Sequence, residues 1–183
     1  MRLGPPDPNH LTAEQKRVHD IIASGPRGRV RGPLAIWLHR PELAEAAQAL
    51  GAYCRYGSSL DPKLSELAIL CMACVWQAEF EWWAHKPIAL KAGLAPEIVE
   101  ALKAGGRPSF ADPEEAIVHD VVFALSRERK IPDALYAKGT DVLGTGRLVD
   151  LVGLCGYYTL ISMTLNAFEV SLPDGETYEL TTP

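Results

Sequence analysis

The stretch PKLSELAILCMACVWQAEFEWWAHKPIALKAG, residues 62–93, decides how this chain folds. Asp61 and Pro62 are typical of a helix start, because the aspartate caps the first turn and proline suits the first helical position. The apolar residues that follow recur every three or four positions, as they do along the buried face of a helix. A second helical pattern then runs as far as Gly93, so this stretch predicts two consecutive helices that can fold back on each other.

The same signals predict helices along the rest of the chain. A capping-box signature precedes the first of them, and Pro41 suits the start of a later one. The apolar face expected for that later helix consists of Leu43, Ala47, Leu50 and Cys54. No segment alternates polar and apolar residues as a half-buried strand does. The sequence therefore predicts an all-α bundle of about eight helices joined by short loops.

The length favours a single domain, residues 1–183, with a loose N-terminal arm over residues 1–11 and a polar C-terminal tail over residues 171–183. A hydrophobic share of 48% and a net charge of −5 are typical of a globular protein without an overall attraction to nucleic acid or membrane. The longest apolar run, residues 148–168, contains an aspartate and Asn166, so we expect a buried helix rather than a membrane span. The polar N-terminus does not resemble a signal peptide, so a cytoplasmic protein is expected.

Cys71 and Cys74 form a CxxC pair, which is the spacing of many redox-active cysteines. A reactive thiol of this kind usually lies at a helix N-terminus, whereas Cys71 lies about two and a half turns into its predicted helix. The surrounding residues are apolar, and burial raises the pKa of a thiol. A zinc site would need further ligands, and His85 is the one nearby candidate. The pair is therefore predicted to belong to the core, and neither a metal nor another cofactor is expected.

The polar residues of the second predicted helix offer a different kind of site. Glu81 and His85 are four positions apart, so on a helix they share a face and their side chains can meet. Glu66 can approach this pair if the two helices fold back on each other. Two carboxylates and an imidazole in a half-apolar pocket suit acid–base catalysis, because such surroundings shift pKa values towards neutrality. From spacing alone, an ordinary surface pair of Glu81 and His85 is the simpler interpretation.

Aromatic and cationic residues elsewhere are candidates for lining the same pocket. They are Arg31, Trp37, Tyr56 and Trp82. Arg31 belongs to the segment RGRVR, residues 27–31, whose guanidinium groups suit the binding of a carboxylate or phosphate. For Arg31, Trp37 and Tyr56, packing or loop solvation is an equally good explanation, so the pattern leaves both interpretations open.

The segments LSELAIL, residues 64–70, and AEFEWWAHKPIALKAGL, residues 78–94, resemble the core of the carboxymuconolactone decarboxylase superfamily, which also contains the alkylhydroperoxidase D-like proteins. Residues 31–60 resemble the lead-in of its longer members, and residues 150–170 resemble their closing helix. The resemblance implies an alkylhydroperoxidase D-like helical bundle that assembles as a homotrimer or as a hexamer.

The resemblance also gives a meaning to the spacing of Glu66, Glu81 and His85 along the chain. Members of the peroxidase branch carry a glutamate, a CxxC that begins twelve residues later, and a histidine four residues after the second cysteine. With Glu66 and His85 as anchors, the two cysteine positions fall on Ala78 and Glu81, so both thiols are absent. The decarboxylase branch has a glutamate in place of the second cysteine. The resemblance therefore implies Glu66, Glu81 and His85 as catalytic residues.

The reaction implied by the resemblance is the cofactor-free loss of CO2 from a small carboxylated unsaturated lactone or a related acid. His85 would act as the acid or as a donor to the carbonyl group, and Arg31 or a neighbour in its loop would bind the substrate carboxylate. Glu81 would orient His85, and Glu66 would complete the proton relay. Two alternatives remain open: a peroxidase that uses one of the four cysteines, and a non-catalytic protein that binds a small acid. The expected partners are a small acid or lactone and further copies of the chain, without nucleic acid or membrane.

Overall fold

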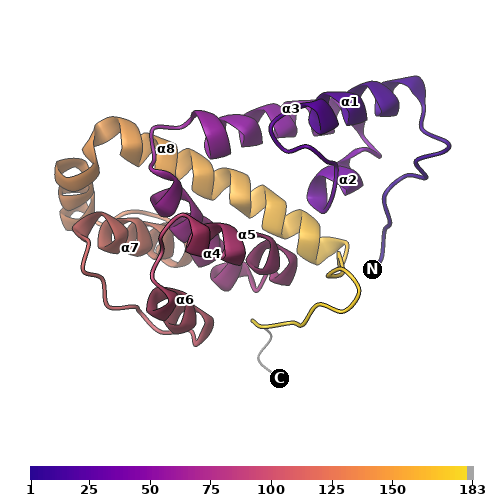
Figure 1. Cartoon of the computed structure of the whole chain (residues 1–183). Coiled ribbons are helices and arrows are strands. Elements are labelled where there is room, and N and C mark those ends of the chain that lie inside the picture. Colours follow the sequence, from indigo (N-terminus) through magenta and orange to yellow (C-terminus); the bar gives the residue numbers. More distant parts are fainter. Residues whose placement is uncertain (181–183) are drawn as a thin grey trace.

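The computed structural model describes residues 1–180 (Figure 1), so residues 181–183 of the predicted tail lie outside the described part. Within residues 1–180 the chain forms eight α-helices and one π-helical turn, and no strand. They are α1 (Ala13–Ser24), α2 (Pro33–Trp37), α3 (Pro41–Ala52), the π-helical turn η1 (Tyr53–Gly57), α4 (Pro62–Trp76), α5 (Glu79–Lys91), α6 (Pro96–Lys103), α7 (Pro113–Glu128) and α8 (Asp133–Ala167). The prediction of an all-α fold with about eight helices is confirmed.

The helices begin where the sequence signals place them. At the start of α1, the Thr12 side chain accepts a hydrogen bond from the N–H of Gln15 (3.2 Å), and the Gln15 side chain accepts one from the N–H of Thr12 (2.9 Å). Asp61 caps α4 by accepting from the N–H of Lys63 at 2.9 Å. Proline lies in the first turn of α2, α3, α4, α6 and α7, where its missing N–H leaves no helical hydrogen bond unmade.

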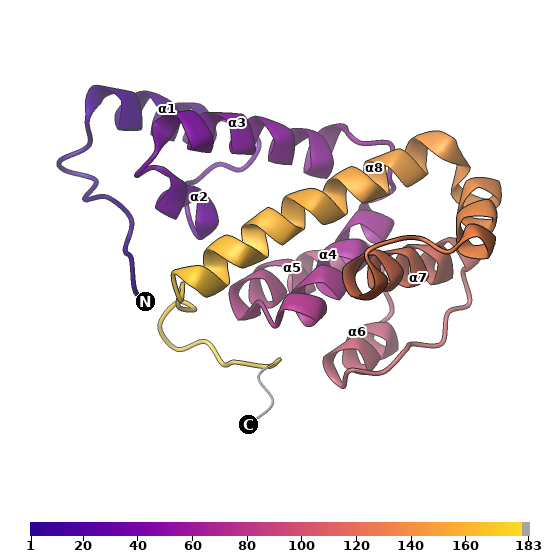
Figure 2. The same cartoon turned by 180° about the vertical axis from the view of Figure 1, so that it is seen from behind.

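Helix α4 is the central element of the bundle. It packs against α5, α7 and α8, and its residues 64–73 are all buried. Figures 1 and 2 show α1 and α3 side by side along one edge, α8 crossing the molecule diagonally, and α4, α5 and α7 on the other side of α8. Because neighbours cover α4 on several sides, it is apolar around most of its circumference. Glu66 is the one carboxylate in this buried run, and it needs a partner there.

Helix α8 is interrupted at Gly144, whose backbone angles (φ 76°, ψ 159°) are not helical. By length and composition α8 is apolar enough to cross a membrane, but 56% of its most apolar window is buried inside the protein. Its contacts with α4 and α7 make it a core helix of the bundle. The prediction of a buried helix over residues 148–168 agrees with this position.

The described part of the C-terminal tail returns to α5. The Glu79 carboxylate accepts hydrogen bonds from the backbone N–H groups of Glu179 (2.9 Å) and Leu180 (2.6 Å). The Glu179 carboxylate accepts hydrogen bonds from Trp82 (3.2 Å) and Lys86 (2.7 Å). One side of α5 is therefore fixed by the tail, and its other side is free to form a site.

Candidate functional site

The three residues predicted to be catalytic meet between α4 and α5. Nδ1 of His85 lies 2.6 Å from Oε2 of Glu66, and Nε2 of His85 lies 2.9 Å from Oε1 of Glu81. All three side chains are buried, with 8% or less of each exposed. Glu81 and His85 meet because they lie one turn apart on α5, and Glu66 joins them because α4 packs against α5. The imidazole is thus held at both of its nitrogen atoms.

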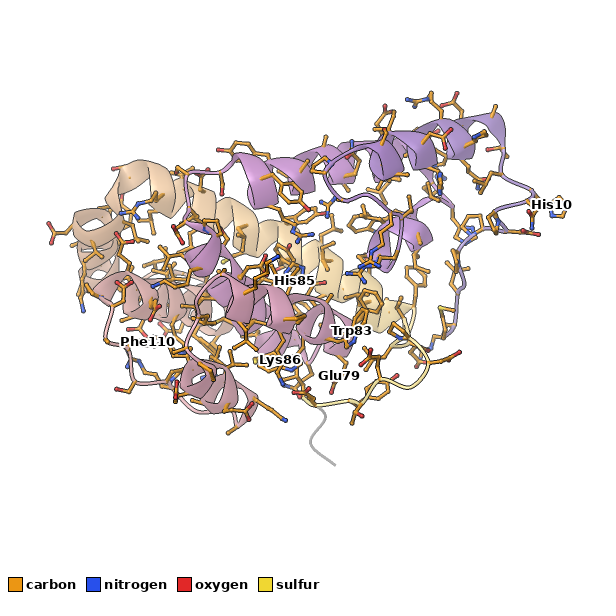
Figure 3. The ribbon with its side chains drawn as sticks, in the orientation of Figure 1. His10, Glu79, Trp83, His85, Lys86 and Phe110 are labelled. Carbon is orange, nitrogen blue, oxygen red and sulfur yellow. The ribbon has the colours of Figure 1, made fainter. Side chains whose placement is uncertain are left out.

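Figure 3 shows how α5 divides its side chains between two sides. His85 points into the interior of the bundle, whereas Glu79 and Lys86 point towards the C-terminal tail. The same helix therefore anchors the tail on one side and presents Glu81 and His85 on the other.

The charge state of His85 is set by two opposing effects. Burial by itself lowers the pKa of an imidazole, because it disfavours the charged form. The charges of Glu81 and Glu66, together with the hydrogen bonds to both carboxylates, outweigh burial and raise the pKa of His85 above its usual value of 6.5. An imidazolium can donate to a carboxylate at each nitrogen, which fits the two short distances. His85 is therefore held as a proton donor near neutral pH.

A cavity of about 210 Å³ opens beside this cluster. Glu81 and His85 form part of its wall, whereas Glu66 contacts His85 from behind and does not line the cavity. The wall also contains four guanidinium groups, those of Arg27, Arg29, Arg31 and Arg55. The cavity combines an acid–base pair with a cationic lining, which suits a small anionic molecule.

Two of the four residues predicted to bind substrate, Arg31 and Tyr56, line this cavity. Trp37 does not line it, because its side chain is buried against α8, where the indole N–H donates to a threonine hydroxyl at 3.0 Å. Trp82 does not line it either, because this side chain is turned towards the tail and donates to Glu179 at 3.2 Å. Both tryptophans are 4% exposed or less, and they contribute to the packing of the bundle.

Known proteins share both the core of this sequence and its fold. Residues 41–119 match the model of the carboxymuconolactone decarboxylase family, a span that includes Arg55, Glu66, Glu81 and His85. No curated protein sequence matches the chain significantly. The family match spans less than half of the chain, and it shows that the segment carrying the Glu66–His85–Glu81 cluster is similar to that family.

Solved structures resemble this chain at low sequence identity. A peroxidase-related protein from Silicibacter sp. TM1040 has a TM-score of 0.75 at 16% identity, covering 95% of this chain and 92% of its own. A peroxidase-related protein from Ralstonia eutropha JMP134, described as an alkylhydroperoxidase AhpD core, has a TM-score of 0.74 at 14% identity, covering 94% and 92%. A protein of unknown function from Agrobacterium tumefaciens has a TM-score of 0.67 at 15% identity, covering 75% and 94%. At these identities the comparison shows the shared fold.

The cysteines of this chain lie away from the cavity. All four are free thiols, and none of them lines it. Burial raises the pKa of Cys71 well above its usual value, and it raises the pKa of Cys74 and Cys155 to about 12. The prediction that the CxxC pair belongs to the core is confirmed, with Cys71 fully buried and Cys74 partly buried.

Three further residues of the site were not singled out by the sequence. Arg55 comes from the π-helical turn η1, and Tyr157 and Tyr158 come from α8. The ring of Tyr158 packs edge-on against the imidazole of His85, with 5.5 Å between the ring centroids. No local pattern indicates these residues, because packing of α8 against α4 brings the tyrosines to the site.

Proposed function

We propose that this protein is a cofactor-independent carboxy-lyase that removes CO2 from a small carboxylated unsaturated lactone or a related acid. The observation that carries the proposal is the position of His85, a buried imidazole held by two carboxylates on the wall of a cationic cavity. The reaction needs an acid with a pKa near neutral pH, because the dienolate left by the loss of CO2 must gain a proton on one of its carbon atoms.

The proposed reaction breaks the bond between a ring carbon and its carboxylate carbon. The electron pair of that bond moves through the conjugated double bond onto the lactone carbonyl oxygen, which gives a dienolate and CO2. The Glu81–His85 pair then supplies a proton to carbon as the negative charge returns there. His85 recovers a proton from water after the product leaves. One proton is consumed for each CO2 released, and the balance needs neither an oxidant nor a reductant.

Glu81 and Glu66 have different roles in this proposal. Glu81 shares the cavity wall with His85 and contacts Nε2, so it can pass the Nε2 proton to a bound substrate. Glu66 contacts Nδ1 on the side of the ring that faces away from the cavity. It therefore orients the ring and stabilises the imidazolium without touching the substrate. The arginines of the cavity wall favour the anionic substrate, and Arg31 is expected to bind its carboxylate.

The alternative is a thiol peroxidase, as the names of two structural neighbours suggest for those proteins. A thiol peroxidase needs a thiolate that peroxide can reach. The four thiols of this chain lie off the cavity, and burial raises the pKa of each. We expect slow reaction of all four with a thiol reagent in the native protein, and no disulfide after exposure to peroxide. A rapidly reacting thiol that forms a disulfide with peroxide would favour the peroxidase.

The carboxy-lyase is tested by incubating the protein with a panel of carboxylated muconolactones and related unsaturated acids while CO2 release is followed. We expect release by the wild type and a loss of about 10²-fold or more in Glu81→Gln and in His85→Ala. The exposed variant Glu42→Gln is the control and should retain activity. Wild-type turnover in both site variants would contradict the proposal. A rise in Tm with a panel member but no CO2 from any of them would favour a non-catalytic protein that binds small acids.

A further inference from the structure

The arginines of the cavity differ from arginines elsewhere in the chain. Arg17, Arg107 and Arg147 each contact both oxygens of one carboxylate, at distances between 2.7 and 3.0 Å. Within residues 1–180, no cavity arginine makes a hydrogen bond with a carboxylate. Arg27 donates to the hydroxyl of Tyr157 at 3.4 Å, and its buried Nε has no partner. Guanidinium N–H groups of the cavity therefore remain able to donate hydrogen bonds to a ligand.

Arg55 is the cavity arginine that lies nearest to the acid–base cluster. Its Nη2 lies 3.9 Å from Oε1 of Glu66, and no other cavity arginine in the described chain is within ion-pair distance of the cluster. The Arg55 side chain is 17% exposed, and its buried Nε has no hydrogen-bond partner. A guanidinium carries five N–H donors in a rigid fork. Arg55 is therefore placed to donate to an oxygen atom of a ligand bound beside His85.

Arg55 extends towards the interior from the π-helical turn η1. A π-helical turn departs from the regular side-chain order of an α-helix, and such turns occur frequently at functional sites. The flanking side chains Tyr53 and Tyr56 are about half exposed, at 52% and 49%, whereas Arg55 between them is mostly buried. The ring of Tyr56 lies 5.1 Å from the guanidinium carbon and supports it from one side.

The positive charge of the cavity is only partly compensated. Burial lowers the pKa of Arg31, and the charges of Arg29 and Arg55 lower it further, so these guanidinium groups repel one another. Glu81 is the one carboxylate that lines this cavity in the described chain. A bound anion removes part of the repulsion. Fixed cations beside a dry site also stabilise charge that develops during a reaction.

We propose that Arg55 is a further catalytic residue, which binds the substrate oxygen on which negative charge accumulates. The inference rests on the proposed function, in which the electron pair of the broken C–C bond moves onto the lactone carbonyl oxygen. Arg55 donates a hydrogen bond to that oxygen in the dienolate, and the charge returns to carbon when the Glu81–His85 pair supplies its proton. Arg31 lies over the ring of Trp83 instead, at 5.2 Å, and keeps its expected role at the substrate carboxylate.

The oxygen contact can be measured without turnover. The probe is 5-hydroxy-2-nitrobenzoate, whose carboxylate resembles that of a substrate and whose phenol oxygen reports ionisation through its absorbance. We expect the wild type to bind the phenolate form and to lower the pKa of the phenol by about one unit or more. Arg55→Gln should remove this shift, and Arg40→Gln, an exposed control, should retain it. The proposal is overturned if the wild type gives no shift, or if Arg55→Gln gives the same shift as the wild type.

Measurement of CO2 release then distinguishes a failure of this inference from a failure of the proposed function on which it rests. Arg55→Gln is expected to lower kcat about 10²–10³-fold with a much smaller change in KM. Added guanidinium ion is expected to restore part of the activity of Arg55→Ala, which a merely structural role would not allow. Unchanged kcat in Arg55→Gln overturns the role of Arg55 and leaves the carboxy-lyase in place. A phenolate shift that depends on Arg55, without CO2 from any substrate, overturns the carboxy-lyase and supports the oxygen contact of Arg55.

Discussion

Nδ1 of His85 lies 2.6 Å from Oε2 of Glu66, although the two residues are 19 positions apart and belong to different helices. Glu66 lies in the buried run of α4, where an unpaired carboxylate would be strongly destabilising. The contact supplies its partner and fixes the ring so that Nε2 meets Glu81 on the cavity wall. His85 thus joins a carboxylate of the core to a carboxylate of the cavity, and the two carboxylates can be tested separately.

Glu81→Gln is expected to lower the pKa of His85. Burial favours the neutral imidazole, and the charge of Glu81 is the largest of the effects that oppose burial. Loss of one opposite charge at this distance lowers a pKa by about 1–3 units. NMR titration of the His85 ring measures the change, with the exposed variant Glu42→Gln as control. The same His85 pKa in Glu81→Gln and the wild type would contradict this account of the site.

The wild type is expected to lose activity on the basic side of its pH profile. The donor form of His85 is present below its raised pKa and disappears as the pH rises through that value, which lies above 6.5. The stabilisation from the ion pairs has the same sign: it is fully present below pH 6.5 and is lost as the pH rises through the folded-state pKa. The pH dependence of kcat measures the loss of the donor form, and the pH dependence of the free energy of unfolding in urea measures the loss of stabilisation. An activity that increases across this range would show that His85 works as a base.

Local signals in the sequence were sufficient for much of the fold and for the pairing of Glu81 with His85, but spacing alone favoured an exposed surface pair, whereas both side chains are buried. Asp61 and Pro62 start α4 as expected, because capping and proline geometry depend on neighbouring residues alone. The meeting of Glu81 and His85 follows from helical spacing, and that of Glu66 follows from two helices that fold back on each other. The start of α4 and the pairing of Glu81 with His85 depend on local sequence, whereas the contact with Glu66 depends on the packing of α4 against α5.

Features that depend on distant packing could not be predicted. Ala47 and Cys54 are buried as expected, but Leu43 and Leu50 are 45% and 49% exposed, so the predicted apolar face of α3 was partly wrong. The inner face carries small residues instead, and at Gly51 the space beside the backbone is filled by Tyr157 of α8. A pattern of hydrophobicity favours leucine for the core, whereas close approach of two helices favours glycine and alanine. The inward direction of Arg55, in the π-helical turn, was likewise not predicted.

Gly51→Ala is expected to weaken substrate binding. A Cβ atom at this position would collide with the hydroxyl of Tyr157 and with Nη2 of Arg27, both of which belong to residues of the cavity wall. Overpacking of this kind typically costs about 1–3 kcal/mol of stability. We expect a lower Tm and an increase in KM, with a smaller change in kcat. Gly146→Ala is the matched control, because a Cβ there meets nothing within 4 Å. Unchanged KM in Gly51→Ala would contradict a role for this wall in binding.

Cys71→Ser is expected to destabilise the protein without changing its activity. The Cys71 thiol is fully buried in α4, so a hydroxyl there loses hydrogen bonds to water and costs about 1–3 kcal/mol. Cys74→Ser is the matched variant and should cost less, because the thiol of Cys74 already donates to the carbonyl of Leu102 at 3.6 Å. Urea unfolding and CO2 release measure the two properties. Loss of turnover in both variants, with stability retained, would indicate thiol chemistry.

Self-association through the outer face of α8 is expected. Exposed apolar or small residues recur there at helical spacing, and they are Val149, Val152, Gly153, Gly156 and Met163. An apolar stripe of this length on a core helix is typical of a surface that a second copy covers, in line with the trimer or hexamer that the family resemblance implies. Light scattering coupled to gel filtration should give an oligomer for the wild type and a smaller species for Val152→Glu, because a buried unpaired charge opposes assembly. Lys138→Glu, an exposed position before the break in α8, should leave the oligomer intact. A monomeric wild type at micromolar concentration would contradict this expectation.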